Sequence, residues 1–311
     1  AALGLALVAP ALTSGATATP ATDTARAAGP GRVIDLPDGF QPEGIAINDR
    51  TAYFGSLADG DIYAYDLDKR DGTVISEGPG TASVGLAVEP RQNRLYVSGG
   101  GAGTVRIVDA GSGDIVADYT VTDGPAFIND VILTPRAAWF TNSAAAELYR
   151  VPITKSGRLP SADRIETVAL RGDWTQPEGF GANGITRTPD GSALLVVNSA
   201  DGTLFRVATR GTRAGTARQV DLDGQSLTNG DGMLQKKRTL YVVRNQLNKV
   251  VKLKLDKRGL EGRKVKTLTS KTFDVPTTID ASRGRLYLPN ARFGTEATPA
   301  TPYTASVIRK R

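Results

Sequence analysis

Three short apolar segments follow one another in residues 44–67, GIAINDRTAYFGSLADGDIYAYDL. They are Gly44–Ile47, Thr51–Gly55 and Asp61–Leu67, and polar turn residues separate them. The apolar spacing is close to two, and β-branched and aromatic residues are enriched, which is typical of strands rather than helices. The stretch therefore predicts a small sheet of at least three strands.

The same unit recurs along the rest of the chain. Equivalent positions at the start of each first strand fall at 43, 85, 129, 183, 231 and 277, with spacings of 42 to 54 residues. A single sheet of this size cannot bury both of its faces, so successive sheets must stack on their neighbours. The repeat predicts an all-β protein, a six-bladed β-propeller.

A lone strand precedes the first unit. Arg32–Leu36 has the composition of a strand, whereas the sixth unit lacks an obvious fourth strand after Arg309. We expect the N-terminal strand to pair with the last blade, because this pairing closes the ring and removes an open sheet edge.

Residues 1–28 are interpreted as a signal peptide and processing segment that is clipped at its start. Ala1–Val8 is an apolar run too short to span a bilayer, and the triplets Ala16-Thr17-Ala18 and Ala25-Arg26-Ala27 are candidate cleavage sites. Residues 29–311 then form the propeller as one domain. The expected location is extracellular, after secretion.

The sequence contains no Cys and no His. This excludes disulfides, thiolate catalysis, Ser-His-Asp chemistry and metal sites built on imidazole or sulfur. A metal bound by this chain must accept oxygen ligands, which leaves calcium, magnesium or manganese.

The net charge is +6, and much of the excess lies in two late stretches, Gln235–Arg238 and Lys249–Lys266. Without interleaved aromatic residues, such stretches are more typical of solvated edge strands than of nucleic-acid sites. We expect a monomer that acts on a small-molecule substrate, with no nucleic-acid and no membrane partner.

In a propeller the residue just before each innermost strand lies near the axis. The six units place Glu43, Gly85, Asn129, Asn183, Asp231 and Thr277 there. Two carboxylates balance a divalent cation, two amides add neutral oxygen ligands, and the two small residues leave room for water or substrate. Asn-Gly and Asp-Gly pairs are also common hairpin turns, but the four oxygen donors share one register ahead of the strand. They predict a site for calcium, with magnesium or manganese as alternatives.

Four segments around these donors resemble the signature segments of the SMP-30/gluconolactonase/luciferin-regenerating-enzyme superfamily. They are Pro42-Glu43-Gly44, Ile128-Asn129-Asp130, Ala182-Asn183-Gly184 and Gly230-Asp231-Gly232-Met233. That group includes calcium-dependent lactonases and phosphotriesterases, and the resemblance extends over residues 32–309. It implies that the four donors bind a catalytic cation and that Asp231 is the nucleophile or general base. Some phosphotriesterases of the group carry histidines, so the lack of His disfavours that substrate class.

The expected function is a secreted, calcium-dependent hydrolase of a lactone or ester. The alternative is a non-catalytic extracellular propeller that binds a ligand or protein partner and holds a structural calcium. Relatives of the strictosidine-synthase type keep the fold without the metal, and the complete donor set argues against that type. A longer connection between Pro152 and Asn183 suits either a pocket lid or a partner-binding loop. Its Trp174 suits packing between blades and contact with a ligand equally well.

Overall fold

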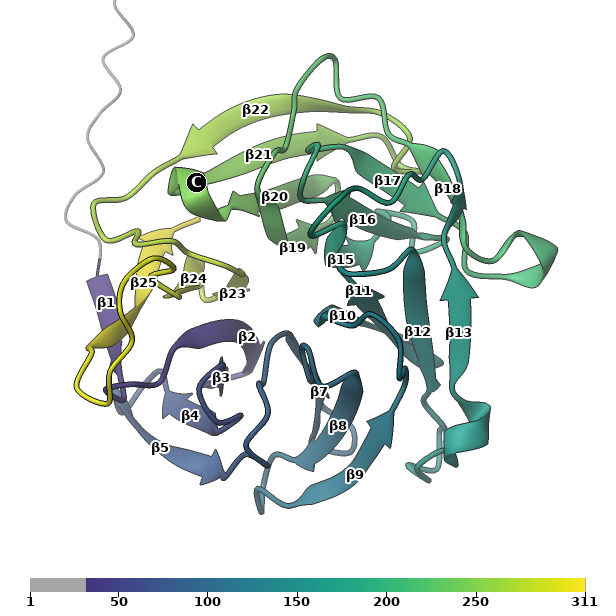
Figure 1. Cartoon of the computed structure of the whole chain (residues 1–311). Helices are drawn as coiled ribbons and strands as arrows, with labels where there is room; N and C mark the ends of the chain where they lie inside the picture. The colour runs from purple at the N-terminus through teal and green to yellow at the C-terminus, as the bar shows by residue number, and fades with distance from the viewer. Residues whose placement is uncertain (1–31, 311) are drawn as a thin grey trace, which may run out of the picture.

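The computed structural model describes residues 32–310, which form six antiparallel sheets arranged as a ring (Figure 1). Five sheets have four strands, and the fourth blade has a fifth, β14, that runs parallel to β18. The predicted six-bladed propeller is confirmed. The predicted processing segment, residues 1–28, lies outside the described residues. None of the helices within residues 32–310 has the length and apolar character needed to cross a membrane.

The first three blades follow the chain in order. Blade 1 consists of β2 (Pro42–Asn48), β3 (Thr51–Ser56), β4 (Ile62–Asp66) and β5 (Asp71–Ser76). Blade 2 consists of β6 (Leu86–Glu89), β7 (Arg94–Ser98), β8 (Thr104–Asp109) and β9 (Ile115–Thr120). Blade 3 consists of β10 (Ile128–Thr134), β11 (Ala137–Asn142), β12 (Glu147–Pro152) and β13 (Glu166–Ala169), with the 3-10 turn η1 (Ala162–Arg164) before β13.

The last three blades complete the ring. Blade 4 consists of β15 (Ala182–Arg187), β16 (Leu194–Asn198), β17 (Leu204–Val207), β18 (Thr216–Gln219) and β14 (Arg171–Gly172), with the turn η2 (Gly211–Arg213). Blade 5 consists of β19 (Gly230–Lys236), β20 (Thr239–Arg244), β21 (Lys249–Leu255) and β22 (Gly262–Leu268), with the turn η3 (Asn245–Leu247). Blade 6 consists of β23 (Asp280–Ser282), β24 (Arg285–Asn290), β25 (Tyr303–Arg309) and β1 (Arg32–Leu36).

The ring closes as the sequence predicted. Strand β1 pairs antiparallel with β25, from Arg32 opposite Val307 to Leu36 opposite Tyr303. The first described strand is therefore the outer strand of the last blade. Its inward side chains, Ile34 and Leu36, join a core cluster that also contains residues of blade 1.

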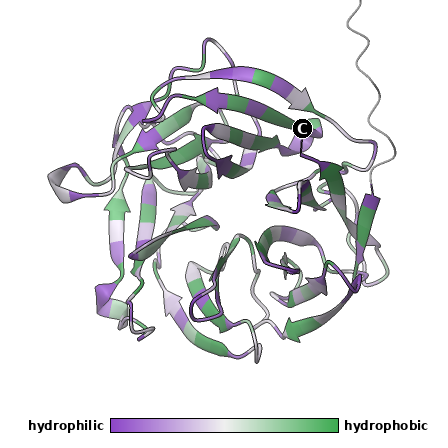
Figure 2. Ribbon diagram, turned by 180° about the vertical axis from the view of Figure 1, so that it is seen from behind, coloured by the Kyte–Doolittle hydropathy of each residue, from purple (hydrophilic) through white to green (hydrophobic). Residues whose placement is uncertain are grey.

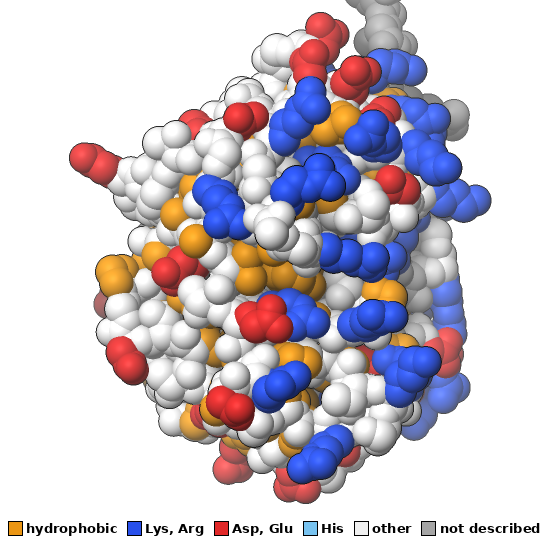
Figure 3. Space-filling view, turned by 90° about the vertical axis from the view of Figure 1, so that its right-hand side faces the viewer, with side chains coloured by type: hydrophobic (Ala, Val, Ile, Leu, Met, Phe, Trp, Pro, Cys, Tyr) orange, Lys and Arg blue, Asp and Glu red, His pale blue; other side chains and the backbone are white. Residues whose placement is uncertain are grey.

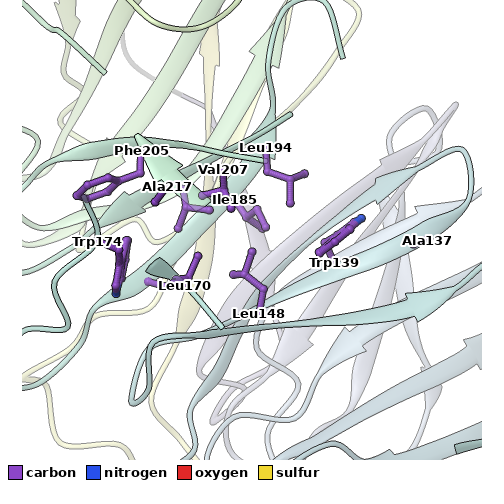
Figure 4. Packing of buried hydrophobic residues seen from close by; sticks show 12 residues of the cluster. Ala137, Trp139, Leu148, Leu170, Trp174, Ile185, Leu194, Phe205, Val207 and Ala217 are labelled. Atoms are coloured by element: carbon purple, nitrogen blue, oxygen red, sulfur yellow. The ribbon is translucent and has the colours of Figure 1, made fainter. Parts of the chain in front are cut away.

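The core consists of apolar layers between neighbouring blades. Figure 2 shows hydrophobic stretches in the strands of every blade and hydrophilic ones at many of the turns. The layer between blades 3 and 4 contains Trp139, Leu148, Ile185 and Trp174 (Figure 4). Trp174 is buried, and its ring centroid lies 4.9 Å from that of Phe205. Of the two roles considered for this residue, packing between blades is the one that the structure supports.

Candidate metal centre

Each of the four predicted donors lies in a β-bulge of an innermost strand. The register shifts between Pro42 and Ile45 in β2, and the corresponding shifts occur in β10, β15 and β19. Two residues of each inner strand, the donor and its successor, thus face one residue of the next strand. A bulge bends the strand and changes the direction of the inserted side chain. All four donors are buried, with exposed fractions of 3–6%.

The cross-strand register corrects one predicted position. Ala46 faces Tyr53 in blade 1 and Ala87 faces Tyr96 in blade 2, so Val84, not Gly85, corresponds to Glu43. The predicted place of Gly85 in the ring is therefore wrong, and a buried apolar side chain occupies that position. Thr277 has the predicted place, but its hydroxyl donates to the Glu43 carbonyl at 2.7 Å and is fully buried. It joins blade 6 to blade 1 rather than leaving open space.

Glycine follows several of these positions because the neighbouring blade is very close. A Cβ atom on Gly44 would lie 2.1 Å from the carbonyl oxygen of Val84, and one on Gly184 would lie 2.1 Å from that of Asp231. Both distances are far below van der Waals contact. The Glu-Gly and Asn-Gly pairs thus fit the close packing of inner strands around the axis, and they are not hairpin turns.

The carboxylates of the site interact strongly with one another. Burial, together with repulsion from Asp231 and Asp130, raises the pKa of Glu43 well above its ordinary value. Burial also raises the pKa of Asp231 to about 8; Asp130 adds to the shift, while hydrogen bonds from Asn245, Asn183 and the Gly232 N–H oppose it. Negative charge is therefore costly at this place unless a cation compensates it.

The two amides have different surroundings. Asn129 Nδ2 donates to Ser143 Oγ at 3.0 Å, and that hydroxyl donates to the Ala182 carbonyl at 2.7 Å. This arrangement uses the nitrogen of Asn129 and leaves its Oδ1 for another partner. Asn183 Oδ1 is buried and has no hydrogen-bond partner. A buried acceptor without a partner costs free energy, about 1–3 kcal/mol, and commonly marks an ion or water that completes the site.

These observations test whether the residues fit a divalent cation. Within residues 32–310, no group of three or more Asp, Glu, His or Cys side chains has the arrangement of a metal site. A cation would therefore need the amide oxygens of Asn129 and Asn183 in addition to Glu43 and Asp231. The unpartnered Asn183 oxygen and the repelling carboxylates fit an oxygen-ligated ion such as calcium.

Two further residues contribute to the site and were not among the predicted donors. Asp130 follows Asn129 in the bulge, and its carboxylate accepts the N–H groups of Val131 at 2.8 Å and Ile185 at 3.0 Å. Burial raises its pKa to about 6, and these two N–H groups oppose the shift. Asn245, from η3, donates to Asp231 Oδ2 at 2.6 Å. A sequence signal existed for Asp130, because four other blades have Gly at that position, but nothing in the sequence connects Asn245 to Asp231.

An aromatic pair lies close along the chain to the two amides. Phe127 precedes Asn129 by two residues and Phe180 precedes Asn183 by three. Their rings meet edge to face with centroids 4.9 Å apart. Phe180 is 53% exposed, which is unusual for a Phe and provides an apolar surface at this end of the ring.

Fold and site together define a six-bladed β-propeller with a cluster of buried oxygen donors contributed by four inner strands. Among solved structures, the chain is similar to regucalcin of Agrobacterium tumefaciens, described as a calcium-binding protein, with 18% identity, a TM-score of 0.64, and coverage of 90% of this chain and 95% of that one. It is also similar to a luciferin-regenerating enzyme, with 13% identity, a TM-score of 0.63, and coverage of 89% and 95%. The predicted six-bladed propeller fold is thus shared with these structures.

Two other comparisons extend this result. The major allergen Mala s 1 of Malassezia sympodialis has 15% identity, a TM-score of 0.67, and coverage of 88% of this chain and 95% of that one. The family described as "Strictosidine synthase-like, N-terminal" matches residues 31–65, a segment that includes Glu43. No curated protein matches the chain. At these identities the structural likenesses establish the fold alone.

The raised pKa values predict how the metal-free protein responds to pH. Folding raises the pKa of Glu43 and Asp231 above the ordinary values of about 4, so the folded protein holds these protons more tightly than the unfolded chain. Their contribution to stability is present at low pH and is lost as the pH rises toward 8. We expect the melting temperature with chelator to fall between pH 5 and pH 9, and calcium to reduce this fall. Scanning calorimetry measures both, and a chelated protein whose melting temperature rises over that range would contradict the expectation.

Proposed function

We propose that this chain is a calcium-dependent hydrolase of lactones or esters that acts outside the cell. The observation that carries the proposal is the buried cluster at the axis, in which Glu43 and Asp231 repel one another and Asn183 Oδ1 has no partner. Clusters of this kind, with strongly shifted pKa values, are more frequent at functional sites than elsewhere. The regucalcin and luciferin-regenerating-enzyme structures support the proposal through their shared fold.

The residues divide the chemistry between them. When bound, calcium would supply a Lewis acid that polarises the substrate carbonyl. Glu43, Asn129 and Asn183 hold the cation and fix its place. Asp231 acts as general base or nucleophile, and Asn245 orients its carboxylate through the 2.6 Å hydrogen bond to Oδ2. Asp130 ties the bulge of blade 3 to β15 of blade 4 and so positions the two amide ligands.

The aromatic pair favours a substrate with an apolar or aryl group. Phe180 offers an exposed apolar surface that packs on the half-buried Phe127, and both residues lie close along the chain to the two amides. Removing such a surface from water on binding stabilises the complex. An aryl ester or an alkyl-substituted lactone therefore suits the site better than a fully hydroxylated sugar lactone.

The rival function is a propeller without catalysis that uses this end of the ring to bind a partner. The strictosidine-synthase-like match over residues 31–65 supports it, since the family resemblance implies that relatives of that type keep the fold without the metal. The complete set of four donors favours the hydrolase. The two functions differ in whether calcium is needed for turnover.

A chelation experiment tests the proposal. We expect hydrolysis of aryl esters or alkyl lactones by the purified protein, loss of at least about 90% of the rate with chelator, and recovery with added calcium. A magnesium arm and a manganese arm identify the cation. If calcium raises the melting temperature but no ester, lactone or phosphotriester is hydrolysed, the site is structural and the rival function is correct.

A further inference from the structure

Two buried hydroxyl groups join blade 3 to blade 4 beside the candidate metal centre. Thr141 lies in β11, and Ser143 directly follows that strand. In the side view of Figure 3, charged side chains of both signs are spread over the outside of the ring. Thr141 and Ser143, by contrast, are both 0% exposed. Their hydroxyl groups therefore need hydrogen-bond partners within the protein.

The Thr141 hydroxyl bridges the backbones of two inner strands. Its Oγ1 accepts from the Asp130 N–H of β10 at 3.0 Å and donates to the Asn183 carbonyl of β15 at 2.8 Å. A longer contact of 3.4 Å reaches the Asp130 carbonyl. All of these partners are backbone groups, so Thr141 joins the strands that carry the two amides without a hydrogen bond to either amide side chain.

The Ser143 hydroxyl makes a similar bridge, but one of its partners is the side chain of a predicted ligand. Its single proton goes to the Ala182 carbonyl of β15 at 2.7 Å. Toward Asn129 the hydroxyl can therefore only accept, and the amide atom that lies 3.0 Å from it must be the nitrogen. The two orientations of an Asn amide have nearly the same shape, so this acceptor decides that Oδ1 of Asn129 is the atom left for a cation.

The backbone of Ser143 holds its hydroxyl in place. The Ser143 N–H donates to the Phe127 carbonyl at 2.9 Å. The Ser143 carbonyl accepts from the Gly181 N–H at 2.8 Å and from Gln176 Nε2 at 3.0 Å. These partners belong to the two connections that carry the aromatic pair. The hydroxyl cannot move away from its acceptor and donor partners without breaking contacts to both connections.

The second amide is oriented by a different kind of group. The side chain of Asn183 donates a hydrogen bond to the Asp231 carboxylate, and its Oδ1 has no partner. In both amides the nitrogen is thus bound within the protein and the oxygen is left over. Asp231 is itself a predicted ligand, whereas Ser143 is a neutral residue outside the donor set that contacts the site only through Asn129 Nδ2.

We propose that Ser143 is a positioning residue of the cation site, and that its hydroxyl orients the Asn129 amide with the oxygen available to a divalent cation. The proposal rests on the cation site of the proposed function and not on hydrolysis. Replacement of Ser143 by Ala leaves Asn129 Nδ2 without its acceptor, so the amide is free to turn its N–H groups toward the cation. Residues that orient metal ligands typically contribute about 10–100-fold to metal affinity.

Calcium titration calorimetry on two single variants tests this role. We expect Ser143→Ala to raise the calcium Kd by about 10–100-fold. The matched control is Thr141→Val, which removes a buried hydroxyl that joins the same two blades and contacts only backbone groups. Because no ligand side chain loses a partner, the control is expected to keep the calcium Kd within about threefold of the wild type. Melting temperatures with chelator establish that both variants are folded.

A double-mutant cycle with Asn129→Asp separates orientation of the amide from a general effect on the fold. A carboxylate has two equivalent oxygens and needs no orienting partner. In the Asn129→Asp background, Ser143→Ala is therefore expected to change the calcium Kd by less than about threefold. The same 10–100-fold loss in both backgrounds, or equal losses in Ser143→Ala and Thr141→Val, would overturn the proposal and leave Ser143 with a purely structural role.

The calcium measurements also distinguish this proposal from the hydrolase. A wild type that binds calcium and hydrolyses nothing, with affinity lost in Ser143→Ala, would support the role of Ser143 and contradict the hydrolase. Equal calcium affinities of the wild type and Ser143→Ala would overturn the role of Ser143 alone. A wild type that does not bind calcium, magnesium or manganese would overturn both.

Discussion

Replacing Asp231 with Asn is expected to lower kcat/KM for the best ester or lactone by about 10²–10⁴-fold, the range typical of a lost general base. The substitution preserves the shape of the side chain, and the remaining Oδ1 can still accept the hydrogen bond from Asn245. It removes the negative charge, so both the base and one charged ligand of the cation are lost. Because the metal-free site is crowded with negative charge, we expect the variant to melt at the same temperature as the wild type or higher when chelator is present.

The matched control is Asp123→Asn. Asp123 is an exposed carboxylate in the loop before β10, at the same end of the propeller. Its replacement changes the net charge equally and should leave kcat/KM within about twofold. Steady-state kinetics and calcium titration calorimetry measure the two effects. If the Asp231→Asn variant turns over substrate at the wild-type rate, Asp231 is neither the general base nor the nucleophile. That result would not contradict the calcium site itself.

Removal of β1 is expected to unfold the whole ring. A chain that begins at Pro37 lacks the five residue pairs between β1 and β25 and exposes the edge of blade 6. It also loses Ile34 and Leu36, which are 5% and 6% exposed, and burial of each side chain is worth about 1.5–3 kcal/mol. The sum approaches the net stability of an ordinary domain, about 5–15 kcal/mol. We expect either no cooperative thermal transition or a melting temperature lower by more than about 10 °C.

A chain that begins at Arg32 provides the reference for this truncation. Within it, Val33→Ala paired with Asp35→Ala alters only the exposed side chains of β1, since Val33 is 45% exposed, and should change stability by less than about 1 kcal/mol. Circular dichroism during heating gives the melting temperatures of the chain that begins at Arg32, of its double variant and of the chain that begins at Pro37. An unchanged transition in the chain that begins at Pro37 would contradict closure by β1.

The sequence predicted four candidate donors and their shared register, but not the residues that surround them. Glu43, Asn129, Asn183 and Asp231 were found by register, and all four lie in equivalent bulges. The error at Gly85 has a simple cause. A bulge inserts one residue into a strand, and periodicity along the sequence does not reveal which of two neighbouring residues is inserted. Only the cross-strand pairs identify Val84 as the equivalent residue.

The sequence by itself determined the class of fold, the number of blades and the chemistry allowed to the site. Strand periodicity is a local property, the repeat counts the blades, and the absence of His and Cys restricts a metal to oxygen ligands. Tertiary structure decided what depends on distances between blades. It brought Asp130 toward Glu43 and Asp231, and it placed Asn245 on Asp231. Charges act through space, and residues far apart in the chain become neighbours only when the ring has closed.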